Sequence, residues 1–148
     1  MRALGLLAVA PLMVVGLAAS PALSASAAAT PYHAALNAEN EKTPPTNQAG
    51  PTGGTGTATV TIDLASSQLC YDLTWANIDT PNAAHIHRGP ANTSGPIVVI
   101  LEPTSQHRCL NVAGPVLQGI ASDPSGYYVN IHTQSYPNGA VRGQLQSG

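Results

Sequence analysis

Three of the five histidines lie in two short segments that can bring them to one ligand. His85 and His87 are separated by a single residue, and His132 follows forty-odd residues later in the alternating segment 127–133. Successive side chains of a strand point to opposite faces, so both members of a His-x-His pair project from one face. Neutral imidazole binds copper and zinc, and three such nitrogens leave an open position on the ion. The spacing therefore predicts a copper or zinc site at His85, His87 and His132.

An ordinary sheet surface explains the same residues. Half-exposed histidines are common on the outer face of a sheet, and a His-x-His pair alone is a weak motif. His33 and His107 are interpreted as polar surface residues, with a fourth-ligand role as the alternative for either. The sequence leaves the metal site and the plain polar surface open as two interpretations.

Strand parity adds three polar residues to the histidine face. In the segments 128–133 and 140–145, aliphatic residues alternate with polar ones. If the aliphatic side chains enter the core, the polar ones lie on the opposite face. If these strands are neighbours, that face is a continuous polar surface on which Arg142 could hold an anion. Its members are His85, His87, Asn130, His132, Arg142 and Gln144.

Apart from the possible metal site, the sequence gives little support for catalysis, so no catalytic residue is assigned. No serine lies in a G-x-S-x-G segment, and no carboxylate is clearly placed to orient a histidine base. Asp63, Asp72 and Asp79 are spread along strands and turns, and we interpret them as solvated or capping carboxylates. This pattern favours a binding protein over an enzyme.

The elements that would position these residues are mostly strands. Alternating or apolar runs separated by turn residues occur at 32–37, 57–64, 69–75, 97–101, 127–133 and 140–145. The Asn138-Gly139 pair indicates a hairpin, and Pro115 suits the start of one short helix at 116–121. We therefore expect an all-β fold, an antiparallel Greek-key-like β-sandwich or barrel with at most one short helix.

One expected strand differs from the others. The segment 97–101 is apolar at every position, which predicts a strand covered on both sides or packed against a partner.

The N-terminus has the pattern of an export signal. Arg2 precedes an apolar run at 3–17, and small residues follow, with Ala25-Ser26-Ala27 as a cleavage motif. We expect residues 1–29 to be a signal peptide cleaved at about 27–29, leaving one domain at 30–148 with a flexible loop at about 43–56. The product would then be secreted into the extracellular space.

Composition narrows the partners of the mature chain. Residues 30–148 hold four Lys and Arg against seven Asp and Glu, a net charge of −3, with no basic patch. This argues against nucleic acid and against a membrane surface as partners after signal cleavage.

Cys70 and Cys109 are the only two cysteines. In an exported protein an even count predicts a disulfide, and no C-x-x-C spacing supports the rival catalytic or metal-binding interpretation. The bridge would close a 40-residue loop that contains His85 and His87, worth on the order of 4 kcal/mol in the chain-entropy treatment.

Several of these segments together resemble one known family. The strings Ala84-His85-Ile86-His87-Arg88-Gly89, Tyr127-Tyr128-Val129-Asn130-Ile131-His132-Thr133 and Ala140-Val141-Arg142-Gly143-Gln144-Leu145 resemble the CHRD (chordin) domain, and the likeness extends over about residues 31–146. It implies an all-β extracellular domain of undefined partner, and the cysteine pair is similar to that of many bacterial secreted members. Ala140 departs from the Glu that is frequent at its position.

A fainter likeness is to copper–zinc superoxide dismutase, also a Greek-key sandwich with an H-x-H strand, a later His, a disulfide and a C-terminal Arg. This chain has no evident His and Asp cluster for the zinc site of that enzyme. The leading hypothesis is thus a secreted, non-catalytic extracellular binding module of undefined partner, whose histidine face is the binding surface for copper or zinc or for another ligand. The alternatives are a copper-dependent redox protein and a cell-surface structural or adhesion protein.

Overall fold

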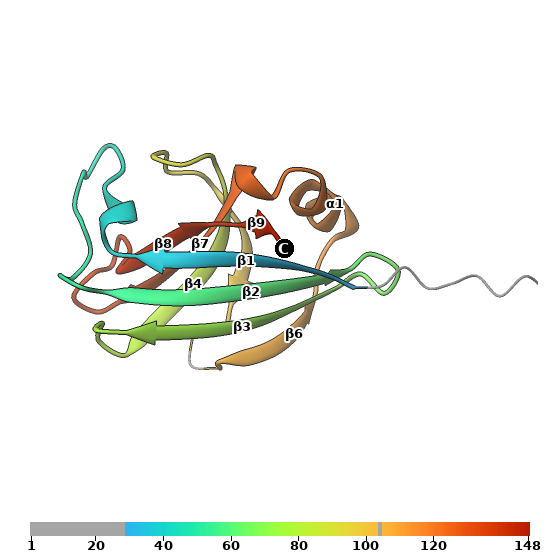
Figure 1. Ribbon diagram of the computed structural model, residues 1–148, viewed down its shortest axis with the longest axis horizontal. Helices are drawn as coiled ribbons and strands as arrows, with labels where there is room; N and C mark the ends of the chain where they lie inside the picture. The colour runs from blue at the N-terminus through green and yellow to red at the C-terminus, as the bar shows by residue number, and fades with distance from the viewer. Residues whose placement is uncertain (1–28, 104) are drawn as a thin grey trace, which may run out of the picture.

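The computed structural model describes residues 29–103 and 105–148 (Figure 1). The predicted signal peptide, apart from Ala29, lies outside these residues and stays a prediction. The described chain contains nine strands, one α-helix and two short 3-10 helices. The strands are β1 (Thr30–Asn37), β2 (Thr55–Asp63), β3 (Gln68–Ala76), β4 (Pro81–Arg88), β5 (Ile97–Leu101), β6 (His107–Asn111), β7 (Tyr127–Thr133), β8 (Val141–Gln144) and β9 (Gln146–Ser147), and the helices are η1 (Glu39–Glu41), α1 (Gly114–Ser122) and η2 (Pro124–Gly126).

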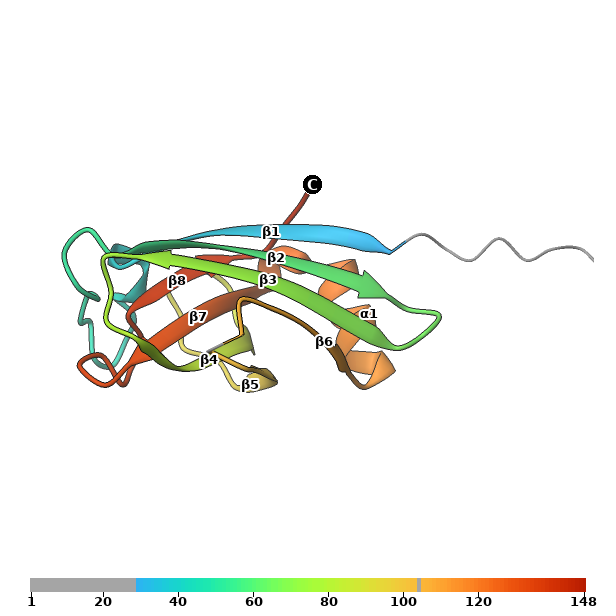
Figure 2. The same ribbon diagram turned by 90° about the horizontal axis from the view of Figure 1, so that it is seen from below.

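All nine strands belong to one antiparallel sheet. Its order is β5-β4-β7-β8-β1-β2-β3-β6, with the short β9 paired to β1. The sheet curls, so β1, β2 and β3 form one layer and β7, β4 and β5 face them from the other (Figure 2). The predicted all-β antiparallel fold with at most one short helix is confirmed.

The core lies between these layers and follows the predicted alternation. In β2, Ala58, Val60 and Ile62 are buried, and in β7 Val129 and Ile131 are fully buried. Leu64 is the exception, because its side chain is 49% exposed although parity placed it inside. The strand ends one residue earlier, where the Asp63 carboxylate accepts hydrogen bonds from the amides of Ala65 and Ser66 and begins the turn.

The strand β5 is an edge of the sheet and is covered on one face only. Val99 and Leu101 are buried, whereas Ile97 is 49% and Ile100 72% exposed. The interpretation of a strand covered on both sides by its own chain is therefore wrong. An all-apolar run does not distinguish cover by the same chain from an unpaired apolar face.

The helix α1 agrees with the expected helix at 116–121 and is longer by a few residues. Pro115 occupies its first turn, where the missing N–H costs no hydrogen bond, and Leu117 and Ile120 are fully buried in the core. The helix lies beside η2, which leads directly into β7 (Figure 1).

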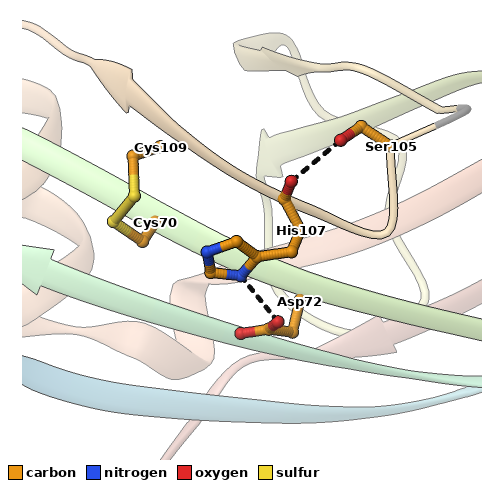
Figure 3. Close-up of polar contacts among 5 residues, drawn as sticks. All are labelled: Cys70, Asp72, Ser105, His107 and Cys109. Carbon is orange, nitrogen blue, oxygen red and sulfur yellow. Dashed lines mark hydrogen bonds and ion pairs between the residues drawn. A yellow bond between two sulfur atoms is a disulfide. The ribbon is translucent and has the colours of Figure 1, made fainter.

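The predicted disulfide joins β3 to the edge strand β6. Cys70 and Cys109 are directly opposite in the register of the two strands and form the bond (Figure 3). Free cysteines are absent from the described residues.

The chain from 38 to 54 connects β1 to β2, so Thr55 and Gly56, the last two residues of the predicted loop, belong to β2. The flexibility of this loop stays a prediction.

Candidate metal centre

Three neighbouring strands carry the predicted polar face. In the register of β4, β7 and β8, His85 is opposite Asn130, which is opposite Arg142. Two residues further along β4, His87 is opposite Tyr128, which is opposite Gln144. Since all of these positions alternate with buried aliphatic residues, their side chains share the face opposite the core. The three strands that parity alone could not place side by side are thus neighbours.

The three predicted ligands come together on this face. The Nδ1 atom of His85 lies 3.1 Å from the Nε2 atom of His132. Each of the three rings offers one nitrogen within 4.8 Å of the others, and all three side chains are half-buried. Nitrogens bound tetrahedrally at about 2.0 to 2.1 Å from zinc are about 3.4 Å apart, so small side-chain shifts would suffice for a shared ion.

Backbone carbonyls orient two of the imidazoles. The Nδ1 of His87 lies 2.8 Å from the carbonyl oxygen of Gly95, and the Nδ1 of His132 lies 3.1 Å from that of Pro137. A carbonyl only accepts, so in each neutral ring Nδ1 carries the proton and Nε2 carries the lone pair. Carbonyl partners of this kind hold metal-binding histidines in position in metalloproteins.

The Nε2 atom of His87 is buried and has no hydrogen-bond partner within the described residues. The Oδ1 atom of Asn130 on the neighbouring strand is also buried without such a partner, and the Asn130 side chain lies close enough to His87 to raise its pKa. A buried polar atom without a partner costs about 1–3 kcal/mol, so it requires an explanation such as an ion or water. The lone pair of His87 is therefore available to a ligand on this face.

All three histidines are held neutral. Burial lowers the pKa of His85, with the nearby His87 acting in the same direction. Burial also lowers the pKa of His87, and it lowers the pKa of His132 to about 4, where the positive potential of His85 adds to the effect. Neutral imidazole is the form that binds a metal ion, so none of the three rings has to lose a second proton before it binds an ion near pH 7.

An aromatic side chain supports the site from within the same face. The Tyr128 ring stacks on His87 with centroids 4.7 Å apart and planes inclined by 5°. The guanidinium carbon of Arg142 lies 3.3 Å from the centre of the Tyr128 ring. The hydroxyl of Tyr128 accepts a hydrogen bond from the amide of Gly95, the residue that also anchors His87. The Tyr128 ring thus fixes the position of His87.

Arg142 and Gln144 hold the loop 89–96 over this face. Arg142 is only 2% exposed and donates to the carbonyl oxygens of Thr93 and Pro90, at 2.6 and 3.1 Å. The Gln144 amide donates to the carbonyl oxygen of Gly89 at 3.0 Å and to two carbonyls near η2. The expected open polar surface is thus largely covered at these two residues, because parity reports which face a side chain takes and not what lies over it. A binding role for Asn130, Arg142 and Gln144 stays a prediction.

Sequence reasoning missed three contributors. Tyr128 has the same parity as Asn130 and His132 but was not counted as a member of the face, and the carbonyls of Gly95 and Pro137 lie in loops whose approach no local pattern indicates. Gly95 is one available signal: a Cβ there would lie 1.8 Å from the carbonyl oxygen of Arg88. Only a glycine permits the loop to approach β4 so closely.

The other two described histidines lie elsewhere. His33 contacts the hydroxyl of Thr59 at 3.2 Å on an exposed face. His107 pairs with Asp72, Nδ1 to Oδ1 at 2.7 Å, beside the disulfide (Figure 3). This carboxylate–imidazole pair was not expected from the sequence, and both side chains are more than half exposed. The Ser105 hydroxyl donates to the main-chain oxygen of His107 and not to its ring, so the three do not form a catalytic relay.

Comparison with known families decides the membership of the chain. A family model described as the CHRD domain matches residues 32–145, which include every residue of the histidine face. The chain belongs to the CHRD domain family. This CHRD domain is an extracellular-type module, with which its disulfide agrees. Neither the comparison with curated proteins nor that with solved structures found a match. Within the described part of the CHRD chain, no helix has the length and apolar character needed to cross a membrane.

Proposed function

We propose that this CHRD domain is a secreted, non-catalytic binding module that holds a copper or zinc ion through His85, His87 and His132. The single observation that carries the proposal is the buried, unpartnered Nε2 of His87 beside the close pair of His85 and His132. A merely structural histidine face would be expected to satisfy its buried nitrogens. Three neutral imidazoles are a donor set that copper and zinc both accept.

The ion would take one nitrogen from each ring. The Nε2 atoms of His87 and His132 are the donors left free by their carbonyl partners, and His85 lies against His132 on the neighbouring strand. Three protein ligands leave a further coordination position, which an unidentified extracellular partner or solvent would fill. Copper(II) is expected to bind more tightly than zinc at such a nitrogen site.

Secretion is part of the same proposal. The export-signal pattern at 1–29, the Cys70–Cys109 disulfide and the likeness to bacterial secreted members support it together. Localising the chain with and without residues 1–29 in a bacterial host tests it. Retention of both forms in the cytoplasm would contradict secretion.

Metal titration tests the binding function. Metal-stripped protein is titrated with Cu(II) and Zn(II), together with the triple variant His85→Ala, His87→Ala, His132→Ala. The matched control is His33→Ala, His107→Ala, which removes the two described histidines that lie outside the cluster. Binding that the triple variant loses and the control keeps supports the proposal. Equal binding by wild type and triple variant would rule it out.

A copper-dependent redox protein is the second candidate, favoured by the open coordination position that three histidine ligands leave. Superoxide turnover by the copper-loaded protein separates the two, since a binder has no turnover above that of the triple variant.

A third candidate is a cell-surface structural or adhesion protein, favoured by the exposed Ile97 and Ile100 on the edge strand β5. Sedimentation of the mature domain and of an Ile100→Lys variant tests it. A concentration-dependent association that the variant loses would support it.

A further inference from the structure

A second polar cleft lies apart from the three histidines, at the end of the molecule where two loops meet. The segment after η1 and the turn between β7 and β8 lie at the same end in both views (Figures 1 and 2). Together with Ser94 of the loop 89–96 they enclose a cleft of about 290 Å³. This volume is at the small end of ligand sites, so it suits a small molecule or one side chain.

Among the described residues, the Glu41 side chain is the only charged group that lines the cleft. Its residue is 6% exposed, and its Oε1 atom is buried without a hydrogen-bond partner within the described residues. A buried carboxylate that lacks a partner is costly, and the cost falls when a cation or hydrogen-bond donor reaches it.

Gly139 makes room for this carboxyl group. A Cβ at this position would lie 2.3 Å from the carboxyl carbon of Glu41 and 2.4 Å from both oxygens. The φ angle of Gly139 is +138°, which disfavours any residue with a side chain. The turn between β7 and β8 therefore approaches Glu41 in a way that only glycine allows, and the carboxyl group is held at the wall of the cleft.

Three hydroxyl groups of the cleft already donate their hydrogens within the protein, so they offer only lone pairs to a ligand. The Ser94 hydroxyl donates to the carbonyl oxygen of Pro44, so in its 2.9 Å contact with Thr43 the Thr43 hydroxyl is the donor. The Thr46 hydroxyl donates to the carbonyl oxygen of Thr43. Each of the three hydroxyl hydrogens is thus used within the protein. Gln48, Tyr136 and Asn138 also line the cleft, and their amide and hydroxyl groups can donate or accept, so the Glu41 carboxyl is the group that distinguishes a cation from a neutral ligand.

The described cationic side chains nearest to Glu41 do not form an ion pair with its carboxyl group in the cleft. Lys42 follows Glu41 but pairs with Glu39 at 2.5 Å on the exposed side of η1. Arg142 acts on Glu41 electrostatically, yet its guanidinium donates to the carbonyls of Thr93 and Pro90 and to Gln144. No Lys, Arg or His from residues 29–103 or 105–148 lines the cleft itself.

We propose that this cleft is a binding site for a primary ammonium group. The Glu41 carboxylate forms an ion pair with the ammonium, and the surrounding hydroxyl and amide oxygens accept its hydrogen bonds. An ammonium group carries one positive charge and three donors and no acceptor, which matches one carboxylate among lone pairs. The ammonium belongs to a free amine or to a lysine side chain of a partner, and the chemistry of the cleft is common to both.

The test is an NMR titration of the mature protein at pH 8 with n-butylammonium, and separately with Nα-acetyl-lysine-methylamide. Saturable shifts are expected at the amides of Ser94, Asn138 and Gly139, which border the cleft. Saturation by the free amine alone assigns the site to small amines, and tighter binding of the lysine derivative assigns it to a protein partner. The neutral probe n-butanol, of nearly the same shape, is expected to produce no saturable shift.

Glu41→Gln removes the charge and keeps the shape, and is expected to weaken ammonium binding at least tenfold. Glu39→Gln is the matched control, since Glu39 lies in the same 3-10 helix with its side chain 73% exposed. Thermal unfolding of both variants verifies that they are folded. Unchanged affinity in a folded Glu41→Gln protein would overturn the proposal. Equal binding of n-butanol, or binding of a monosaccharide or Ca²⁺ in preference to the amine, would overturn it as well. Metal binding at the three histidines is read separately, so failure of either proposal leaves the other standing.

Discussion

The Nδ1 atom of His85 and the Nε2 atom of His132 lie 3.1 Å apart, although 47 residues separate the two histidines in the chain. Because His132 directs its Nδ1 proton to the carbonyl of Pro137, its Nε2 is the acceptor and His85 donates. One proton therefore lies between two rings that a metal ion would bridge. An ion that binds both rings replaces this hydrogen bond, so metal binding exchanges one native interaction for stronger ones.

Removal of one ligand should weaken binding without unfolding the domain. We expect His132→Ala to lower Cu(II) affinity by at least a hundredfold, since it removes both a nitrogen donor and the partner of His85. Competition with a chelator of known affinity measures the change. His33→Ala, on an exposed face of β1, is the control and should leave the affinity within twofold. A loss of similar size in both variants would mean that the histidine cluster is not the site.

Arg142 should contribute more to the stability of the fold than an exposed arginine such as Arg108 does. Arg142→Lys keeps the charge but cannot reproduce hydrogen bonds to Thr93 and Pro90 together with the contact to Tyr128. We expect the free energy of unfolding to fall by about 1–3 kcal/mol, because the part-buried Thr93 carbonyl loses its donor and the Pro90 carbonyl keeps only the Thr93 hydroxyl. Urea unfolding measures it. Arg108→Lys, whose side chain is 55% exposed at 3.9 Å from Glu102, should change stability by less than about 0.5 kcal/mol.

The free energy of unfolding should depend on pH through the ionisation of Glu41. Burial raises the pKa of Glu41 from 4.5 to about 7, with Arg142 acting in the opposite direction. The folded protein then binds the proton more tightly than the unfolded chain, so this contribution is fully present below pH 4.5 and is lost as the pH rises to about 7. A shift of this size corresponds to about 3 kcal/mol.

Urea unfolding of wild type and Glu41→Gln at pH 5, 6, 7 and 8 isolates that contribution, because every other titratable side chain is the same in both proteins. The free energy of unfolding of wild type should fall relative to the variant across this range and then level off. Glu39→Gln should follow the wild-type curve, since its carboxyl group is exposed. Parallel curves for wild type and Glu41→Gln would show that Glu41 titrates normally.

Local pattern predicted the faces of this fold and left the contacts between distant segments undetermined. The alternation in β2 and β7 placed Val60 and Val129 inside, and His87 and His132 on the other side, because the period of a strand is local. Which strands pair is decided by contacts far apart in sequence, so the meeting of His85 with His132 was only a conditional expectation. The burial of Glu41 was missed entirely, since its neighbours Lys42 and Thr43 indicate an ordinary polar loop.

The disulfide should stabilise the fold without shaping the metal site. Cys70 and Cys109 are cross-strand neighbours in β3 and β6, on the side of the sheet order opposite to β4 and β7. We expect Cys70→Ser, Cys109→Ser to lower the free energy of unfolding by about 4 kcal/mol, because the unfolded chain regains the freedom of a loop of about 40 residues. The Cu(II) affinity of the folded variant should remain within threefold of wild type, since the strands β3 and β6 that carry the cysteines do not pair with the strands β4 and β7 that carry His85, His87 and His132. Equilibrium unfolding and the same chelator competition measure the two quantities independently. A variant that stays folded but loses metal affinity would mean that the edge strand β6 and the histidine face are coupled through the core that the two layers share.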